Sequence, residues 1–471
     1  MQNTETGRKV RIAVTAILAC AFFLIGCSGE TAESPELPAE STEESMEQMV
    51  SEDTNEQETA DTAAETPKRF QYREELFALG LPVVTEEQAT AAGKTLLTLQ
   101  PNLPNTWLKN AVAGFNRQSA DYFIRLEEPK ETSEKERLFA EVMAGRGPDI
   151  IAGNVFEINE GILKKGILAD LAPGLDAMGI SDEEYFPSFR TLRMGDGVYG
   201  IQPYLSPNGL AIRESVLGSS EQPDIETLVE RLYTYPDQEA VWYSNARSNV
   251  ILEYLLSGSQ DLWGMIDWEE GTCDFSGELF ARMLEIAKRY ADPEGKTRET
   301  EDKWLVFTYY PIWKSREHLE SEGKIVINYP FDDGNYPAYS RLGDTIMLNA
   351  SSQHPEGAWE FLRYLLDEEG QCYTTDMDAV VASREMSRNY FAYELDLLEE
   401  GRMQTSGDYT SETVEELLAF TEQGRQVPLR TKEILAIIYE EAQTYCDGDK
   451  PLEEVCDVIQ KKVQIYISEN I

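Results

Sequence analysis

The sequence predicts an α/β fold for most of the chain, and three observations support that prediction. From residue 95 onward, short apolar runs of strand character alternate with segments that repeat apolar residues at helical spacing. Glycine, proline and asparagine stand at many of the changes between them. Hydrophobic residues make up 41% of the chain and aromatic residues 10%, enough for a packed core. Such alternation is typical of sheets with helices on their faces.

The first 26 residues have the pattern of a secretory signal peptide. Three basic residues precede a charge-free run, 12–25, that is shorter than the ~20 residues a membrane-spanning helix needs. The run ends in Gly26 and Cys27, which resembles the lipobox of bacterial lipoproteins. In that class the cysteine carries diacylglycerol and becomes the first mature residue. A plain signal peptide with a chance cysteine is the alternative.

Residues 27–67 are predicted to be an acidic, disordered tether. Between residues 29 and 66 the chain has 13 acidic residues, no Lys or Arg, and almost no large apolar side chain. Such a segment cannot bury enough apolar surface to offset the entropy lost on ordering. A flexible chain of this length reaches about 35 Å. Residues 68–94 are predicted to form an N-terminal extension, which either packs on the folded part or lengthens the tether.

Charge and histidine content exclude several classes of function. The chain has 86 acidic and 41 basic residues and a formal charge of −45, which argues against nucleic acid and against electrostatic docking on anionic lipid. The two histidines, His318 and His354, are expected on the surface, and they are too few for a multi-histidine metal site. We therefore expect no metal, no cofactor and no catalytic residue.

Four cysteines follow Cys27, namely Cys273, Cys372, Cys446 and Cys456. Outside the cytosol a disulfide is permitted, and a turn between two helical patterns separates Cys446 from Cys456. These two thiols could therefore pair. Four unpaired thiols are the favoured alternative.

The first elements of the folded part alternate in type. A strand is expected at 95–99, a helix over 107–115, a strand at 121–126, a helix after a capping box at Ser133 and Glu136, and a buried strand at 147–152. Sheets of this kind bind ligands at the carboxyl ends of their strands. Asn102 and Asn154 follow two of the strands and are predicted to bind ligand.

A series of motifs then appears in a fixed order along the chain. They are the run 96–116, Gly147-Pro148-Asp149-Ile150, and the segments 166–171, 185–187, 196–204, 328–336, 350–352, 355–362, 434–449 and 452–467. Each motif is weak alone, but their order resembles the extracellular solute-binding proteins of ABC importers, family one, which includes the maltose-binding proteins. The resemblance covers about residues 95–471. One departure is Leu210–Arg213, where the family usually has Tyr-Asn-Lys.

The resemblance implies a two-lobed α/β fold of the periplasmic-binding-protein type II class. Each lobe would be a mixed sheet flanked by helices, and hinge crossings would join the lobes. Lobe 1 is predicted at 95–205 and 327–368, and lobe 2 at 209–324 and 372–471. The implied protein is a monomer on the outer face of the cytoplasmic membrane. It holds a small solute between its lobes and delivers it to an ABC permease.

One competing motif is a match to G-x-G-x-x-G at Gly195–Gly200. A dinucleotide loop must open a helix, and Pro203 would stop such a helix here. An Asp-Gly pair before an apolar run indicates a hairpin instead. The sequence also has no G-x-S-x-G nucleophile motif and no P-loop.

The resemblance makes a carbohydrate, held between the lobes in the family's manner, the predicted ligand. Sugars favour flat aromatic rings and planar polar groups. The predicted ligand-binding residues are Asn102, Asn154, Tyr204, Trp242, Tyr243, Tyr309, Tyr310, Asp332 and Tyr336. Ordinary core packing is the alternative for each aromatic residue.

Three other functions stay open on the sequence alone. The acidic charge would suit a cationic or peptide ligand. A surface sensor or adhesin would need no permease. A secreted enzyme acting on glycosides would need two carboxylates across the scissile bond, and so many acidic residues make any chosen pair uninformative.

Overall fold

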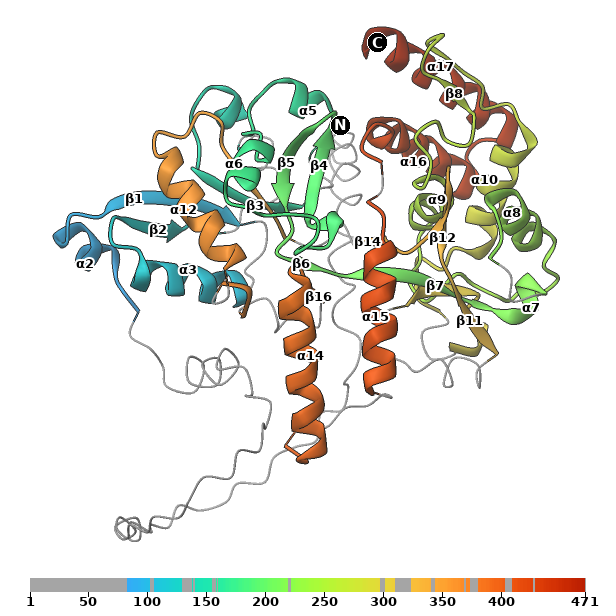
Figure 1. The fold of residues 1–471 in the computed structure, drawn as a ribbon. Helices are drawn as coiled ribbons and strands as arrows, with labels where there is room; N and C mark the ends of the chain where they lie inside the picture. Colours follow the sequence, from blue (N-terminus) through green and yellow to red (C-terminus); the bar gives the residue numbers. More distant parts are fainter. Residues whose placement is uncertain are drawn as a thin grey trace, which may run out of the picture. The chain divides into compact units, whose positions relative to one another are not determined.

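Figure 1 shows the fold in a computed structural model. The structure describes residues 83–101, 106–128, 138, 140–154, 158, 160–218, 222–296, 301–309, 323–339, 344–367, 370–372, 380–402, 409–426 and 428–470. The predicted signal peptide, the tether with Cys27, His318, Asn102 and Tyr310 lie outside these ranges. Among the helices within them, none combines the length and apolarity that crossing a bilayer requires.

The first lobe is built on a six-stranded mixed sheet. Its strands are β1 (Thr95–Pro101), β2 (Tyr122–Leu126), β3 (Ile150–Asn154), β4 (Arg190–Met194), β5 (Gly197–Ile201) and β15 (Asp344–Leu348). They lie in the order β2-β1-β3-β15-β5-β4. The first three pair in parallel, while β15 runs antiparallel to β3 and β5. The predicted early strands and the β4–β5 hairpin are thereby confirmed, and β15 joins them from a distant part of the chain.

Both faces of this sheet are covered. Ile150 and Ala152 of β3 belong to a large core with residues of the helices α3 (Thr106–Gln118) and α12 (Pro355–Leu366). Ile151, between them, belongs to a smaller cluster that includes Leu163 of α5 (Glu160–Lys164). Alternate residues of a strand point to opposite faces, so the sheet separates the two clusters. A third helix, α6 (Ala172–Ala177), adds Leu175 to the large core.

Part of the predicted N-terminal extension packs on this lobe. The helix α2 (Glu86–Ala91) begins after Thr85, whose hydroxyl accepts a hydrogen bond from the Gln88 main-chain N–H. The Gln88 side chain accepts one from the Thr85 N–H in return, which completes a capping box. The helix contacts β1 and β2, so these residues belong to the folded part.

The second lobe has a four-stranded sheet centred on β7 (Pro207–Arg213). The strands β10 (Val306–Tyr309), β11 (Lys324–Ile327) and β14 (Ala338–Tyr339) all pair antiparallel with β7. Its helices are α7 (Glu214–Leu217), α8 (Ile225–Thr234), α9 (Ser248–Leu256), α10 (Glu278–Tyr290), α16 (Lys432–Cys446) and α17 (Leu452–Asn470). A second large core joins β7, β10 and β11 to helices α7 to α10, α16 and α17. The two C-terminal helices confirm the helical patterns predicted there.

The segment from β16 to α15 packs on the first lobe. The short strands β6 (Tyr204–Leu205) and β16 (Val380–Val381) pair, and the helices α14 (Arg384–Glu399) and α15 (Ser411–Gln423) follow. Met386, Phe391 and Leu417 from these helices belong to the first core. The range 372–471, predicted for lobe 2, therefore contributes to both cores. The lobe boundaries along the sequence stay a prediction.

Candidate functional site

Two parallel strand ends of the first lobe lie side by side, as predicted. Pro101, the last residue of β1, is paired with Ala152 of β3, and Asn154 ends β3 two residues later. Asn154 is in turn paired with Asp344, the first residue of β15. Carboxyl ends of β1 and β3 thus share one edge of the sheet, where α/β sheets bind ligands.

The buried side chain of Gln100 fixes this edge. Its Nε2 donates hydrogen bonds to the carbonyl oxygens of Glu128, at 2.9 Å, and of Pro101, at 3.1 Å. One amide therefore ties the chain after β2 to the end of β1. A planar amide that is fully occupied in this way positions the strand end and has little capacity left to donate.

Three aromatic rings are stacked in the second lobe. Trp242 lies over Tyr254 of α9 with ring centroids 6.0 Å apart and planes 26° apart. Tyr254 lies over Tyr329 with centroids 5.5 Å apart and planes 27° apart. Trp242 is 1% exposed and Tyr329 is 8% exposed, so the stack runs inside the second core. Stacked rings of this kind stabilise the core and fix the position of Tyr329.

Tyr329 opens a small hairpin made of β12 (Tyr329–Phe331) and β13 (Gly334–Tyr336). In this hairpin Tyr329 is paired with Tyr336. The Asp332 carboxylate, in the turn, accepts a hydrogen bond from the Gln260 main-chain N–H at 2.8 Å. The guanidinium of Arg425 lies 4.3 Å from the centre of the Tyr336 ring. We call Tyr254, Tyr329, Asp332, Tyr336 and Arg425 the hairpin site.

A glycine allows the hairpin to approach the end of α9. A Cβ atom at Gly258 would lie 2.0 Å from the carbonyl oxygen of Pro330, which is in the middle of β12. Main-chain atoms cannot tolerate that distance, so any larger residue must displace the hairpin. The placement of the hairpin site therefore depends on the absence of a side chain at this position.

The crossings between the lobes are bonded to one another beside the hairpin site. The main-chain N–H of Arg425 donates to the Pro337 carbonyl at 2.8 Å. The Gln426 Nε2 donates to the Ser188 carbonyl at 3.1 Å and to Gln202 Oε1 at 3.2 Å. These bonds link the chain after α15 to the chain before β14 and to the first lobe. In hinge motions, a few residues at such positions absorb the change in backbone angles.

Several buried polar atoms near these crossings lack a hydrogen-bond partner among the described residues. They are Trp242 Nε1, Asn335 Oδ1, Asn208 Oδ1 and Gln202 Nε2. Buried polar atoms are nearly always paired, with protein or with ordered water. Asn335 belongs to β13, which also carries Tyr336, whereas Asn208 belongs to β7 of the second-lobe sheet. The region has capacity for further hydrogen bonds.

The predicted ligand-binding residues divide between the two lobes. Tyr204 is buried in the first core, with its ring edge-on to Trp107 at 5.6 Å. Tyr243 is buried in the second core, edge-on to Trp304 at 6.5 Å. Tyr309 ends β10 opposite Gly209. Asp332 and Tyr336 lie in one hairpin, and Trp242 is linked to that hairpin through the stacked rings of Tyr254 and Tyr329.

The sequence reasoning missed three members of the hairpin site. Tyr254 lies within a helix, where an aromatic residue at the spacing of apolar residues is predicted to pack in the core. Tyr329 follows the apolar run of β11 and precedes Pro330, so its position after a strand was a usable signal. Arg425 gave no signal, because only the folded chain brings it against Tyr336.

We compared the sequence with models of known protein families and with curated proteins. Residues 110–389 match the family described as bacterial extracellular solute-binding protein. This range is more than half of the chain. No curated protein is similar enough in sequence to count as a match.

Solved structures with the same fold cover about four-fifths of this chain. The sugar-binding protein MalE from Xanthomonas citri is 15% identical, with a TM-score of 0.54, over 80% of this chain and 98% of that one. Lmo0181 from Listeria monocytogenes, an ABC substrate-binding protein in complex with cycloalternan, is 15% identical, with a TM-score of 0.54, over 80% and 99%. The GacH receptor of Streptomyces glaucescens, in complex with acarbose, is 13% identical, with a TM-score of 0.51, over 80% and 99%. At these identities the likeness concerns the fold, and it confirms the predicted two-lobed α/β class.

Proposed function

Because the chain belongs to the family of bacterial extracellular solute-binding proteins, we propose that it captures a carbohydrate between its lobes. Family membership places the protein outside the cytoplasm and makes it a binding protein for a solute. That the solute is a carbohydrate goes beyond family membership and is part of our proposal. It is supported by the sugar ligands of proteins that share the fold, including cycloalternan and acarbose.

The observation that carries the proposal is the partly buried ring of Tyr336, with the Asp332 carboxylate in the same hairpin and the Arg425 guanidinium over the ring. The stack Trp242–Tyr254–Tyr329 holds this hairpin on the second lobe. A sugar ring needs an aromatic plane for its C–H groups and planar polar groups for its hydroxyls. Tyr336 supplies a ring that is only partly buried, Asp332 an acceptor, and Arg425 donors. One negative and one positive group balance each other, which favours an uncharged ligand.

The proposed contacts extend to the first lobe. Asn102 and Asn154 would donate and accept hydrogen bonds from the ends of β1 and β3, and Tyr309 and Tyr310 would add rings to the proposed set. The buried rings of Tyr204, Trp242 and Tyr243 would support these contacts from within the two cores. Closure of the lobes by rotation at the bonded crossings would bring both groups of residues onto one ligand. The solute leaves unaltered, because the proposed role involves no catalytic residue.

The proposal includes anchoring and delivery. Cys27 would carry the lipid, and the acidic segment 27–67 would let the lobes reach an ABC permease. Labelling with an alkyne fatty acid tests the anchor. The label should appear on the full chain and be absent from Cys27→Ser, which should be found in the medium. Label on the Cys27→Ser protein would contradict the assignment.

Isothermal titration calorimetry with a panel of oligosaccharides tests the ligand class. The protein should give saturable heat with at least one glycan. Asp332→Asn should weaken that binding about tenfold, because the substitution removes the charge of the acceptor and keeps its shape. Asp333→Asn is the matched control, since Asp333 stands in the same turn and its side chain is exposed.

Three results would remove the carbohydrate assignment. The first is an absence of heat with every glycan combined with binding of a peptide or polyamine. The second is an equal loss of affinity in Asp332→Asn and Asp333→Asn, which would indicate a general effect of charge. The third is turnover of a chromogenic glycoside, which would indicate an enzyme.

A further inference from the structure

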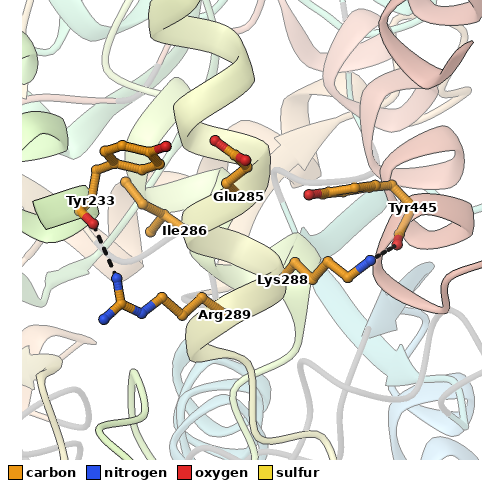
Figure 2. Close-up of a pocket in the computed structure, with 6 residues that line it drawn as sticks. All are labelled: Tyr233, Glu285, Ile286, Lys288, Arg289 and Tyr445. Carbon is orange, nitrogen blue, oxygen red and sulfur yellow. Dashed lines mark hydrogen bonds between the residues drawn. The ribbon is translucent and has the colours of Figure 1, made fainter. Parts of the chain in front are cut away.

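A hollow in the second lobe shares no residue with the hairpin site. It has a volume of about 250 Å³ and is lined by Tyr233, Glu285, Ile286, Lys288, Arg289 and Tyr445. Four of these residues lie on α10, while Tyr233 comes from the last turn of α8 and Tyr445 from the last turn of α16. Figure 2 shows the two phenol groups extending from opposite sides, with Glu285 between them.

Hydrogen bonds from two basic side chains to main-chain carbonyls hold the two tyrosines in place. Arg289 donates to the carbonyl oxygen of Tyr233 at 3.0 Å and also to that of Tyr235. Lys288 donates to the carbonyl oxygen of Tyr445 at 2.7 Å. Both basic groups thus cap the last carbonyls of a helix, where a positive charge is favourable. The hollow is therefore built by hydrogen bonds across three helices and does not depend on loop conformation.

The basic groups are occupied, but the acidic one is not. The Lys288 ammonium lies 4.1 Å from the centre of the Tyr445 ring as well as on its carbonyl. The Glu285 carboxylate has no hydrogen bond or ion pair with any residue in the described ranges. The hollow thus offers a free acceptor between two aromatic side chains. Burial, followed by the charge of Glu285, raises the pKa of Tyr445, so its hydroxyl stays protonated and can donate.

The charge of the lining selects among ligand classes. One carboxylate and two basic groups give the hollow a net positive charge, which opposes a cation even though the whole chain is at −45. An anion would meet Glu285 at the centre. An uncharged ligand with hydroxyl groups and an apolar face meets neither obstacle.

We propose that this hollow is a second carbohydrate site, which binds a single pyranose ring between Tyr233 and Tyr445 with its hydroxyls on Glu285. The volume is just below the ~300–1,000 Å³ of pockets for drug-sized ligands, which limits the site to about one ring. Sugar C–H groups pack on the tyrosine rings, and two adjacent hydroxyls donate to the two carboxylate oxygens. The site goes beyond the proposed capture between the lobes, because it would hold sugar on the second lobe alone.

The test reads the hollow directly, on the full chain. Ile286 lines the hollow, so its δ1-methyl NMR signal, assigned with Ile286→Val, reports binding there and not at the hairpin site. The probe is methyl α-D-glucopyranoside, a single uncharged pyranose, at millimolar concentration. The signal should shift in a saturable way. Because calorimetry reports on capture between the lobes, failure of either site can be distinguished from failure of the other.

Two variants and one control complete the test. Tyr233→Ala, at a position 37% exposed, should abolish the shift by removing one wall. Glu285→Gln keeps the side-chain shape and should raise the apparent Kd about tenfold. Glu226→Gln, an exposed carboxyl in the first turn of α8, should change nothing. An unshifted Ile286 signal, a shift that persists in both pocket variants, or a shift with spermidine in place of the sugar would overturn the proposal.

Discussion

Tyr254 and Tyr329 lie nearly parallel, with ring centroids 5.5 Å apart, although 75 residues separate them in the chain. One ring belongs to a helix and the other to the first strand of the hairpin. Their contact therefore ties the hairpin, with Asp332 and Tyr336, to the body of the second lobe. The proposed ligand contacts depend on this attachment.

Replacing the ring of Tyr254 should weaken carbohydrate binding. Tyr254→Leu removes the plane on which Tyr329 rests and costs about 1 kcal/mol of stacking, together with lost packing. We expect about a tenfold loss of affinity by calorimetry. Tyr254→Phe keeps the plane and should retain most of the affinity. Equal affinities for the leucine and phenylalanine variants would show that the stack does not position the site.

A side chain at Gly258 should displace the hairpin. In Gly258→Ala the new Cβ would meet the Pro330 carbonyl, so β12 must move. We expect a lower free energy of unfolding, by about 2 kcal/mol, and a loss of sugar affinity. Urea unfolding and calorimetry measure the two effects. Gly277→Ala, where a Cβ would meet nothing within 4 Å, is the matched control. Wild-type affinity in Gly258→Ala would contradict the account.

The sequence predicted the local elements better than the site. Helical spacing at Trp107, Leu108 and Phe115 is a local property, and the helix is present. The position of a ring relative to a ligand is not local. Tyr204 and Trp242 are aromatic residues near crossings, yet each is buried in a core. No sequence pattern separates an aromatic residue that packs from one that is presented.

The assignment of segments to lobes has the same limit. The helices α14 and α15 lie between a first-lobe segment and a second-lobe segment in the sequence. Their apolar residues Met386 and Leu417 satisfy helical spacing equally well against either core. The pairing of β16 with β6 and the packing of these residues in the first core show that the helices lie on the first lobe, and both depend on long-range contacts.

Buried Glu441 is predicted to stabilise the second lobe in a pH-dependent way. Its carboxylate lies 2.5 Å from the Lys462 ammonium and 3.4 Å from that of Lys450. The ion pair with Lys462 joins α16 to α17. The bond from Lys462, followed by the charges of both lysines, holds the pKa of Glu441 below its ordinary value. A carboxyl with a lowered folded-state pKa contributes stability above its unfolded pKa, and that contribution is lost as pH falls through the folded pKa.

Glu441→Gln should therefore lower the free energy of unfolding near neutral pH, by about 2 kcal/mol after allowance for the partly exposed lysines. The difference from the unsubstituted protein should shrink as the pH falls below the range of an ordinary carboxyl. Urea unfolding across that range measures it. Glu440→Gln is the control, because its carboxylate is exposed and lies 3.9 Å from Lys462. A difference that does not change with pH would contradict the assignment.

Tyr290 should give the opposite dependence at alkaline pH. Its buried hydroxyl donates to the Leu232 carbonyl at 2.8 Å, and burial raises its pKa to about 12. A raised folded-state pKa gives stability below the unfolded value, and that stability is lost as pH rises through the folded value. Tyr290→Phe should cost about 1 kcal/mol near neutral pH, and the cost should fall from about pH 10 upward. A cost that grows with pH would refute the prediction.

None of the four cysteines of the described part forms a disulfide in the structure, in agreement with the favoured alternative. Cys372 is buried, and burial also raises the pKa of Cys273, Cys446 and Cys456. All four should therefore react slowly with a thiol reagent in the folded protein and rapidly in denaturant. Mass spectrometry that finds a Cys446–Cys456 disulfide in the purified protein would contradict this prediction.

The central claim is that two lobes close on a carbohydrate, and small-angle X-ray scattering tests it most directly. The radius of gyration of the protein should fall when the glycan identified by calorimetry is added to saturation. It should stay constant when a glycan that gives no heat is added. Scattering profiles that are identical with and without the bound glycan would contradict the claim.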